Sequence, residues 1–205
     1  MKKMIGRSNM IRITVKNQVL ELDPGITLEA LKNQLGIEAY AATVNNRIRE
    51  LTFPLTKNSD VVFLDLKDRD AVRIYEATLR YVIAMAVRNL YPNVTVKFNY
   101  SVSRAILGVL ENLDQKIDRN IIKSIDSEMK RLVELDLPII RKNMDLEEAM
   151  ELYKSSGHLD KVAILKYRDE DKVNMYTCDQ YFNYMFGYML PSTGYLTKYA
   201  LSLYH

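Results

Sequence analysis

The chain has 205 residues, of which 48% are hydrophobic and 27% charged. A chain of this length suits one large or two small domains and buries roughly 70% of its surface on folding, so its composition excludes a largely disordered or fibrous protein. The net charge of +3 comes from residues 1–67, which hold 10 basic and 7 acidic residues. So small a surplus favours an ordinary solvated surface over that of a dedicated nucleic-acid binder.

Few residues suit metal or nucleophilic chemistry. Cys178 is the only cysteine, so the chain can form no intramolecular disulfide and no multi-cysteine zinc site. His158 and His205, the two histidines, are expected in a solvated loop and at the end of the chain. No run approaches the ~18 apolar residues of a membrane span, and no export signal is recognisable. We therefore expect a cytoplasmic chain without membrane contact.

Residues 10–67 are predicted to form strands around one short helix. Residues 10–22 contain two alternating apolar runs across Lys16-Asn17, which is typical of a β-hairpin. Thr27 is a suitable N-cap for a helix whose leucines recur at helical spacing until Gly36. Three further short strands are predicted at residues 41–44, 48–51 and 61–66, and Asn45-Asn46 suits a turn between the first two. The resulting order, β-β-α-β-β-β, is that of a ubiquitin-like β-grasp.

Three stretches of this region resemble the TGS domain of threonyl-tRNA synthetases, certain GTPases and stringent-response enzymes. They are Ile26–Leu28 after an Asp-Pro-Gly turn, Ala42–Leu51 and Ser59–Leu64. The resemblance implies an RNA- or ligand-binding module at residues 1–67. Ile26 and Asn46 replace family glycines, but asparagine tolerates positive φ, so the turn at Asn46 can still form.

Residues 68–205 are predicted to form a second domain of the α+β class. Apolar residues at helical spacing, bounded by proline or glycine, predict helices, and Asp118 is a suitable N-cap for one of them. These helices are expected near residues 70–91, 118–135 and 145–157. Strands are expected at residues 94–100, 105–110, 162–167, 173–177 and 199–205.

This second region resembles the additional domain of threonyl- and alanyl-tRNA synthetases, which hydrolyses mischarged tRNA. The match rests on three stretches, Asp70–Pro92, Glu128–Ala149 and Gly187–Gly194. Aligning the motifs places Ala77, Tyr81, Met185 and Met189 where that family keeps its histidine and cysteine ligands. Alanine has no donor, and phenol and thioether groups are weak zinc ligands. We therefore expect no metal, no other cofactor and no catalytic residue in this chain.

The tyrosine-rich stretch Tyr181–Leu196 further resembles bacterial nucleoside kinases of the uridine kinase type, which carry both domains ahead of a P-loop kinase domain. No phosphate-binding P-loop motif occurs among the seven glycines. The resemblance implies an N-terminal fragment of an ATP-dependent kinase. ATP and magnesium are then expected only for a kinase domain in cis beyond His205.

The leading hypothesis is a non-catalytic regulatory region with a degenerate editing cleft that binds a nucleoside, a nucleotide or RNA. Aromatic rings that can stack on bases and polar groups that can orient a ligand make up the candidate binding residues. These are Arg80, Tyr81, Tyr184, Tyr188, Ser192, Thr193 and Tyr195. Two alternatives stay open: a synthetase-related tRNA-binding or editing fragment, and an assembly module that forms a homo-oligomer.

Overall fold

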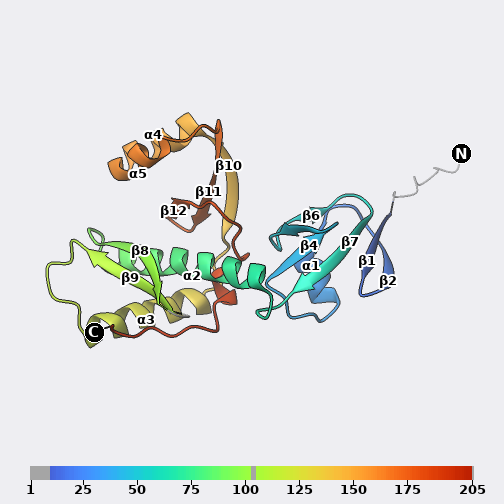
Figure 1. Cartoon of the computed structure of the whole chain (residues 1–205), viewed down its shortest axis with the longest axis horizontal. Coiled ribbons are helices and arrows are strands. Elements are labelled where there is room, and N and C mark those ends of the chain that lie inside the picture. Colours follow the sequence, from blue (N-terminus) through green and yellow to red (C-terminus); the bar gives the residue numbers. More distant parts are fainter. Residues whose placement is uncertain (1–9, 103–104, 205) are drawn as a thin grey trace, which may run out of the picture. The chain divides into compact units, whose positions relative to one another are not determined.

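The computed structural model describes residues 10–102 and 105–204, and it divides into two compact units (Figure 1). The first unit contains the residues up to Val82 together with Tyr188–Pro191 and Tyr195–Ala200. The second contains Ile83–Gly187, Ser192–Gly194 and the residues from Leu201. The α+β class predicted from the sequence is confirmed, since each unit combines helices with strands.

The first unit is built on a five-stranded sheet of the order β2-β1-β7-β4-β5. Strands β1 and β7 pair in parallel, and the other neighbours pair in antiparallel fashion, as in a β-grasp. The strands are β1 (Ile11–Val15), β2 (Gln18–Leu22), β4 (Ala41–Val44), β5 (Arg47–Arg49) and β7 (Ser59–Leu64). A second pair joins β3 (Ile26–Thr27) to β6 (Pro54–Leu55), and the sequence did not predict either of these two short strands.

Two tight turns fix the pairing of these strands. Lys16 and Asn17 both adopt positive φ, and so do Asn45 and Asn46. A two-residue turn with positive φ at both positions has a backbone twist that matches the right-handed twist of the two strands it joins. The predicted hairpin and the predicted Asn45-Asn46 turn are therefore both confirmed.

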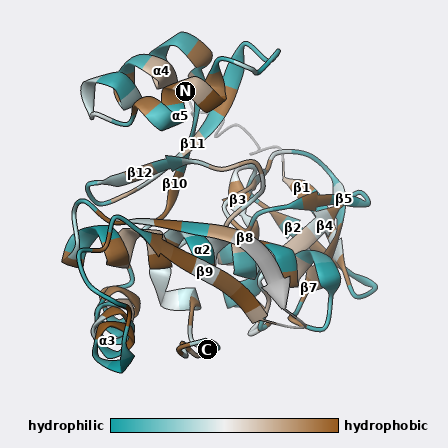
Figure 2. Ribbon diagram, turned by 60° about the vertical axis from the view of Figure 1, so that its left-hand side comes forward, coloured by the Kyte–Doolittle hydropathy of each residue, from teal (hydrophilic) through white to brown (hydrophobic). Residues whose placement is uncertain are grey.

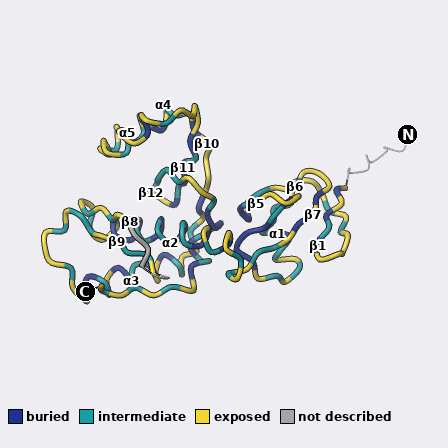
Figure 3. Tube along the Cα trace, in the orientation of Figure 1, coloured by how far each residue is buried: buried dark blue, intermediate teal, exposed yellow. Residues whose placement is uncertain are grey.

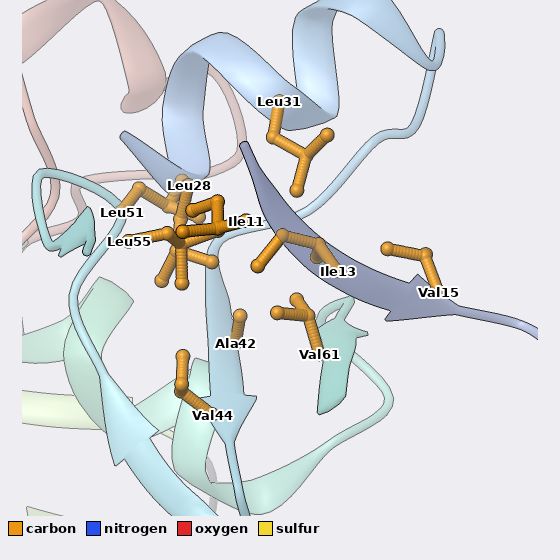
Figure 4. Packing of buried hydrophobic residues seen from close by; sticks show 10 residues of the cluster. All are labelled: Ile11, Ile13, Val15, Leu28, Leu31, Ala42, Val44, Leu51, Leu55 and Val61. Atoms are coloured by element: carbon orange, nitrogen blue, oxygen red, sulfur yellow. The ribbon is translucent and has the colours of Figure 1, made fainter. Parts of the chain in front are cut away.

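Helix α1 (Leu28–Gln34) covers one face of the sheet. The Thr27 hydroxyl accepts the Ala30 amide at 3.1 Å, which confirms the predicted N-cap. Gly36, at a φ of +62°, follows the end of the helix, where glycine adopts the left-handed conformation at no steric cost. Ten buried side chains from the sheet, the helix and the adjoining loops form the core (Figure 4): Ile11, Ile13, Val15, Leu28, Leu31, Ala42, Val44, Leu51, Leu55 and Val61.

Helix α2 (Arg69–Leu90) runs from the first unit into the second. Its buried residues recur every three or four positions, from Ala71 through Thr78 to Met85. Pro92 follows its last turn and prevents the helix from continuing. No helix within residues 10–102 and 105–204 is both long and apolar enough to cross a membrane.

The second unit contains an antiparallel hairpin of β8 (Thr95–Val102) and β9 (Ala105–Glu111), followed by α3 (Arg119–Glu134). Asp118 accepts the amides of Asn120 and Ile121, each at 2.9 Å, so the predicted cap of α3 is confirmed. Figure 2 shows hydrophobic and hydrophilic residues alternating along α3. Its buried side chains are spaced three or four positions apart: Ile121, Ile125, Met129 and Leu132.

A small sheet with its own core completes the second unit. Its order is β10-β11-β12, with both pairs antiparallel. The elements here are β10 (Ile140–Asp145), α4 (Leu146–Ser155), α5 (Leu159–Leu165), β11 (Lys172–Cys178) and β12 (Tyr181–Tyr184). The central strand β11 is largely buried (Figure 3), and Tyr153 of α4 packs in the same core.

Two predicted strands are wrong. Residues 162–167 lie mainly in α5, because Val162 and Leu165, three positions apart, pack together against the core around Tyr153. Residues 199–204 form no strand, and residue 205 lies outside the described residues. Strands β10 and β12 were not predicted. Most residues of β10 are exposed, so this strand lacks the alternating apolar pattern on which the prediction depends.

Candidate functional site

Thr193 holds the turn that follows α3. Its hydroxyl donates to the Leu132 carbonyl at 2.5 Å and accepts the Leu137 amide at 2.8 Å. The Thr193 amide donates to the Leu137 carbonyl at 3.0 Å, and the side chain is fully buried. These contacts satisfy an end of α3 that would otherwise leave polar groups unpaired, so the observed role of Thr193 is structural.

The Asp136 carboxylate organises the neighbouring residues of the same turn. It accepts the Ser192 hydroxyl and the Gly194 amide, the latter at 3.1 Å. Asp136 itself adopts positive φ, a conformation that aspartate tolerates better than most residues do. A Cβ atom built on Gly194 would collide with this carboxylate. The Ser-Thr-Gly sequence is thus explained by the packing of the turn, without any ligand.

Tyr195, in the first unit, makes equally specific contacts. Its hydroxyl donates to the Glu29 carboxylate at 2.7 Å, and the Lys32 ammonium lies 5.1 Å from its ring centroid. The ring also contacts Tyr40 edge-on at 6.3 Å. A ligand at Tyr195 would have to compete with these contacts.

Lys198 continues this cluster. Its ammonium donates to Glu38 at 2.7 Å, and its amide donates to the Tyr75 hydroxyl at 2.7 Å. The hydrogen bond from Lys198 lowers the pKa of Glu38, and burial raises the pKa of Tyr40 and of Tyr75. The tyrosines therefore remain neutral hydrogen-bonding groups near neutral pH.

The first unit holds three other candidate binding residues, Arg80, Tyr81 and Tyr188, which differ in their exposure to solvent. Tyr81 is 1% exposed, whereas Arg80 is half-buried and pairs with Glu76 at 3.3 Å. The Tyr188 hydroxyl accepts a long hydrogen bond of 3.5 Å from Arg49, whose guanidinium lies over the Phe53 ring. Both the phenol and the guanidinium bear donors that a polar ligand can use.

The four positions that the resemblance aligns with metal ligands are divided between the units. Ala77, Tyr81 and Met189 lie in the first unit, and Met185 lies in the second. Between Ala77 and Tyr81, the buried Thr78 hydroxyl donates to Ile74 at 2.8 Å and accepts the Leu190 amide at 2.9 Å.

These four residues do not fit a zinc ion, since they offer one phenol and two thioethers. Among residues 10–102 and 105–204, no group of three or more His, Cys, Asp or Glu side chains has an arrangement that could hold a metal ion.

Tyr184, in the second unit, belongs to a group that includes a residue not predicted from the sequence. Its hydroxyl accepts a hydrogen bond from Arg168, whose guanidinium carbon lies 4.9 Å from the Tyr184 ring centroid. Arg168 also donates to Glu170 at 2.6 Å. No sequence pattern singles out Arg168, because this residue lies in a loop and its partner is 16 positions away on β12.

Cys178 is buried, and His158 is partly so. Burial raises the pKa of Cys178 to about 11, which keeps its thiol protonated and unreactive. His158 is half-buried rather than solvated, contacting the rings of Tyr153 and Phe182, and burial lowers its pKa. Neither residue belongs to a nucleophile–base pair in the contacts of the described chain.

Together, the fold and these sites define a two-unit α+β protein with a β-grasp sheet and abundant tyrosines. Several of these, such as Tyr40, Tyr153 and Tyr195, donate their hydroxyl groups to acceptors within the chain. The chain matches no protein-family model. It is similar to threonine–tRNA ligases over most of its length. The enzyme of Thermotoga petrophila is 27% identical over 184 residues, which are 88% of this chain and 28% of the relative.

Two other threonine–tRNA ligases extend the similarity nearly to the full chain. That of Symbiobacterium thermophilum is 27% identical over 200 residues, and that of Natranaerobius thermophilus is 29% identical over the same length. Each match covers 95% of this chain and 31% of the relative. The chain thus spans less than a third of the length of these curated relatives.

Proposed function

We propose that this chain is a tRNA-binding module of the threonyl-tRNA synthetase type that does not hydrolyse aminoacyl-tRNA. The observation that carries the proposal is the similarity to threonine–tRNA ligases over 88% to 95% of the chain. We also assign the β-grasp sheet of the first unit to the TGS type. The module would work in the cytoplasm, with a domain boundary between residues 67 and 68.

The chemistry at the aligned positions argues against hydrolysis. A hydrolytic site needs a base or a metal-bound water that is active near neutral pH. Alanine, methionine and a buried tyrosine supply neither. The proposal therefore includes no cofactor. It gives a role in binding to the candidates that are only half-buried, which are Arg80, Tyr184, Tyr188, Ser192 and Tyr195. Tyr81 and Thr193 are fully buried, so we assign them a supporting role instead.

Titration of the chain into fluorescently labelled tRNA tests binding directly, with a DNA duplex of equal length as control. Anisotropy that rises with tRNA at lower protein concentration than with the duplex supports the proposal. Equal affinity for both would reduce the interaction to nonspecific phosphate contact. Absence of any rise with tRNA would overturn the proposal.

The tyrosine-rich stretch Tyr181–Leu196 favours a second candidate, the regulatory region of a uridine kinase-type nucleoside kinase. In that case the ligand would be a nucleoside or nucleotide, and ATP with magnesium would serve a kinase domain in cis. Calorimetry with uridine and cytidine separates the candidates. Heat with a nucleoside but no binding of tRNA would favour the kinase.

The third hypothesis, an assembly module, has its own test. Gel filtration over a range of protein concentrations reports self-association. A dimer that forms without affecting tRNA binding would make assembly an additional property. A monomer throughout would exclude the homo-oligomer.

A further inference from the structure

Two aromatic side chains of the second unit are unusually open to solvent. Tyr167 is 89% exposed and Phe186 is 82% exposed. A single exposed hydrophobic side chain is common on protein surfaces, so the neighbours of these two rings decide whether either belongs to a site. In the sequence, Tyr167 adjoins Arg168, and Phe186 lies two positions after Tyr184.

Arg168 connects the exposed ring of Phe186 to Tyr184. Its guanidinium carbon lies 4.9 Å from the centroid of Tyr184 and 5.8 Å from that of Phe186. Both distances suit a cation–π contact. The Arg168 side chain is 21% exposed and is fixed by hydrogen bonds to the Tyr184 hydroxyl and to Glu170. We call Arg168, Tyr184 and Phe186 the Arg168 platform.

The platform is anchored to the core of the small sheet. The Tyr184 amide donates to the Tyr153 hydroxyl at 2.6 Å, and that hydroxyl donates to Asn183 at 2.9 Å. Tyr153 is 2% exposed and lies among the buried residues of this core. The anchoring limits the conformational entropy that Tyr184 can lose when a ligand binds.

Flat aromatic faces next to a fixed guanidinium suit a planar ligand with negative charge nearby. An unpaired RNA base can meet both conditions, because its π-face stacks on the ring and its phosphate can compete with Glu170 for the Arg168 guanidinium. We propose that the Arg168 platform is a stacking site for an unpaired RNA base, with Phe186 as its exposed face. This inference rests on the proposed tRNA-binding function.

The test uses the full chain and a single-stranded RNA hexamer with 2-aminopurine at a central position. Stacking on Phe186 should quench the 2-aminopurine fluorescence. Phe186→Leu keeps an apolar side chain but removes the π-face, and we expect it to weaken hexamer binding about 5- to 100-fold. Phe186→Trp should retain binding and quenching.

Tyr204→Ala is the matched control, since Tyr204 is another exposed aromatic residue of the same unit, at 68%. It should leave binding unchanged. Quenching that persists in Phe186→Leu, or failure of the hexamer to bind while tRNA binds, would overturn the platform and leave the proposed function intact. Failure of both RNAs to bind would overturn both. If Phe186→Leu abolished self-association and left RNA binding unchanged, the Arg168 platform would be a protein interface, and the proposed stacking site would be overturned.

Discussion

At the scale of single residues, Gly194 is constrained by the carboxylate of Asp136. An added methyl group would collide with this carboxylate, which also accepts the Ser192 hydroxyl and the Gly194 amide. We expect Gly194→Ala to lower the free energy of unfolding by about 1–3 kcal/mol, the usual cost of overpacking. Urea denaturation followed by circular dichroism measures this change.

Gly187→Ala is the control for this substitution. No atom lies within 4 Å of a Cβ built on Gly187. We therefore expect a change within about 0.5 kcal/mol. Equal destabilisation by both substitutions would contradict the role assigned to Asp136.

The Tyr153 hydroxyl is a second group whose removal should measurably lower the free energy of unfolding. Tyr153→Phe removes the acceptor of the Tyr184 amide and the donor to Asn183 while keeping the ring in the core. Leaving such groups unpaired should cost about 1–3 kcal/mol in the free energy of unfolding, as measured by urea denaturation.

Tyr167→Phe removes a hydroxyl from a side chain that is 89% exposed, and it should be nearly neutral. If Tyr153→Phe were also neutral, the hydrogen bonds of Tyr153 would not stabilise the small sheet.

At the scale of elements, α3 depends on its N-cap. Asp118→Ala removes the acceptor for the amides of Asn120 and Ile121, so we expect lower stability, whereas Asp118→Asn keeps a good cap and should retain it. On α4, Asp145 makes no side-chain capping hydrogen bond, so Asp145→Ala should have the smaller effect. Thermal melts of the three variants rank these effects.

The cap of α3 also predicts a dependence on pH. The hydrogen bond from the Ile121 amide, followed by bonds from Asn120, lowers the pKa of Asp118 below its ordinary value of 3.8. A lowered pKa means that the stabilisation is present above the ordinary value and disappears as the pH falls through the folded-state pKa. The difference in melting temperature between wild type and Asp118→Ala should therefore shrink at acidic pH. A constant difference down to pH 2 would show that the charge of Asp118 is irrelevant.

The elements that local signals define were predictable from the sequence. Thr27, Asp118 and the paired asparagines at 45 and 46 act through neighbours within a few positions, and the structure confirms each of them. Helix α5 was mistaken for a strand because a short apolar run does not distinguish the two states without its packing partners. Strand β10 was missed because its pairing with β11 depends on residues more than 25 positions away.

The contacts of the candidate residues were less predictable. The sequence singled out Tyr184, Ser192, Thr193 and Tyr195, but nothing in it indicates that Thr193 bonds to Leu132 or that Tyr195 bonds to Glu29. Such contacts join positions 61 and 166 residues apart. The role of these residues in ligand binding remains a prediction.

At the scale of the whole molecule, the chain is similar to threonine–tRNA ligases over most of its length. The positions that we align with reactive residues, Ala77, Tyr81, Met185 and Met189, carry no side chain suited to hydrolysis. Binding of tRNA and hydrolysis of its aminoacyl ester depend on different groups. A chain can therefore bind tRNA without hydrolysing the ester. The internal use of the hydroxyls of Thr193 and Tyr195 further removes polar groups that could activate water. We therefore expect a complex with tRNA that leaves its aminoacyl ester intact.

Filter binding with tRNA esterified to radioactive serine measures both properties at once. The tRNA carries the threonine anticodon, retained label reports binding, and label lost from the ester over time reports hydrolysis. We predict saturable retention by the chain and an ester half-life equal to that in buffer. Absence of retention, or faster loss of serine in the presence of the chain, would contradict a non-hydrolytic tRNA-binding module.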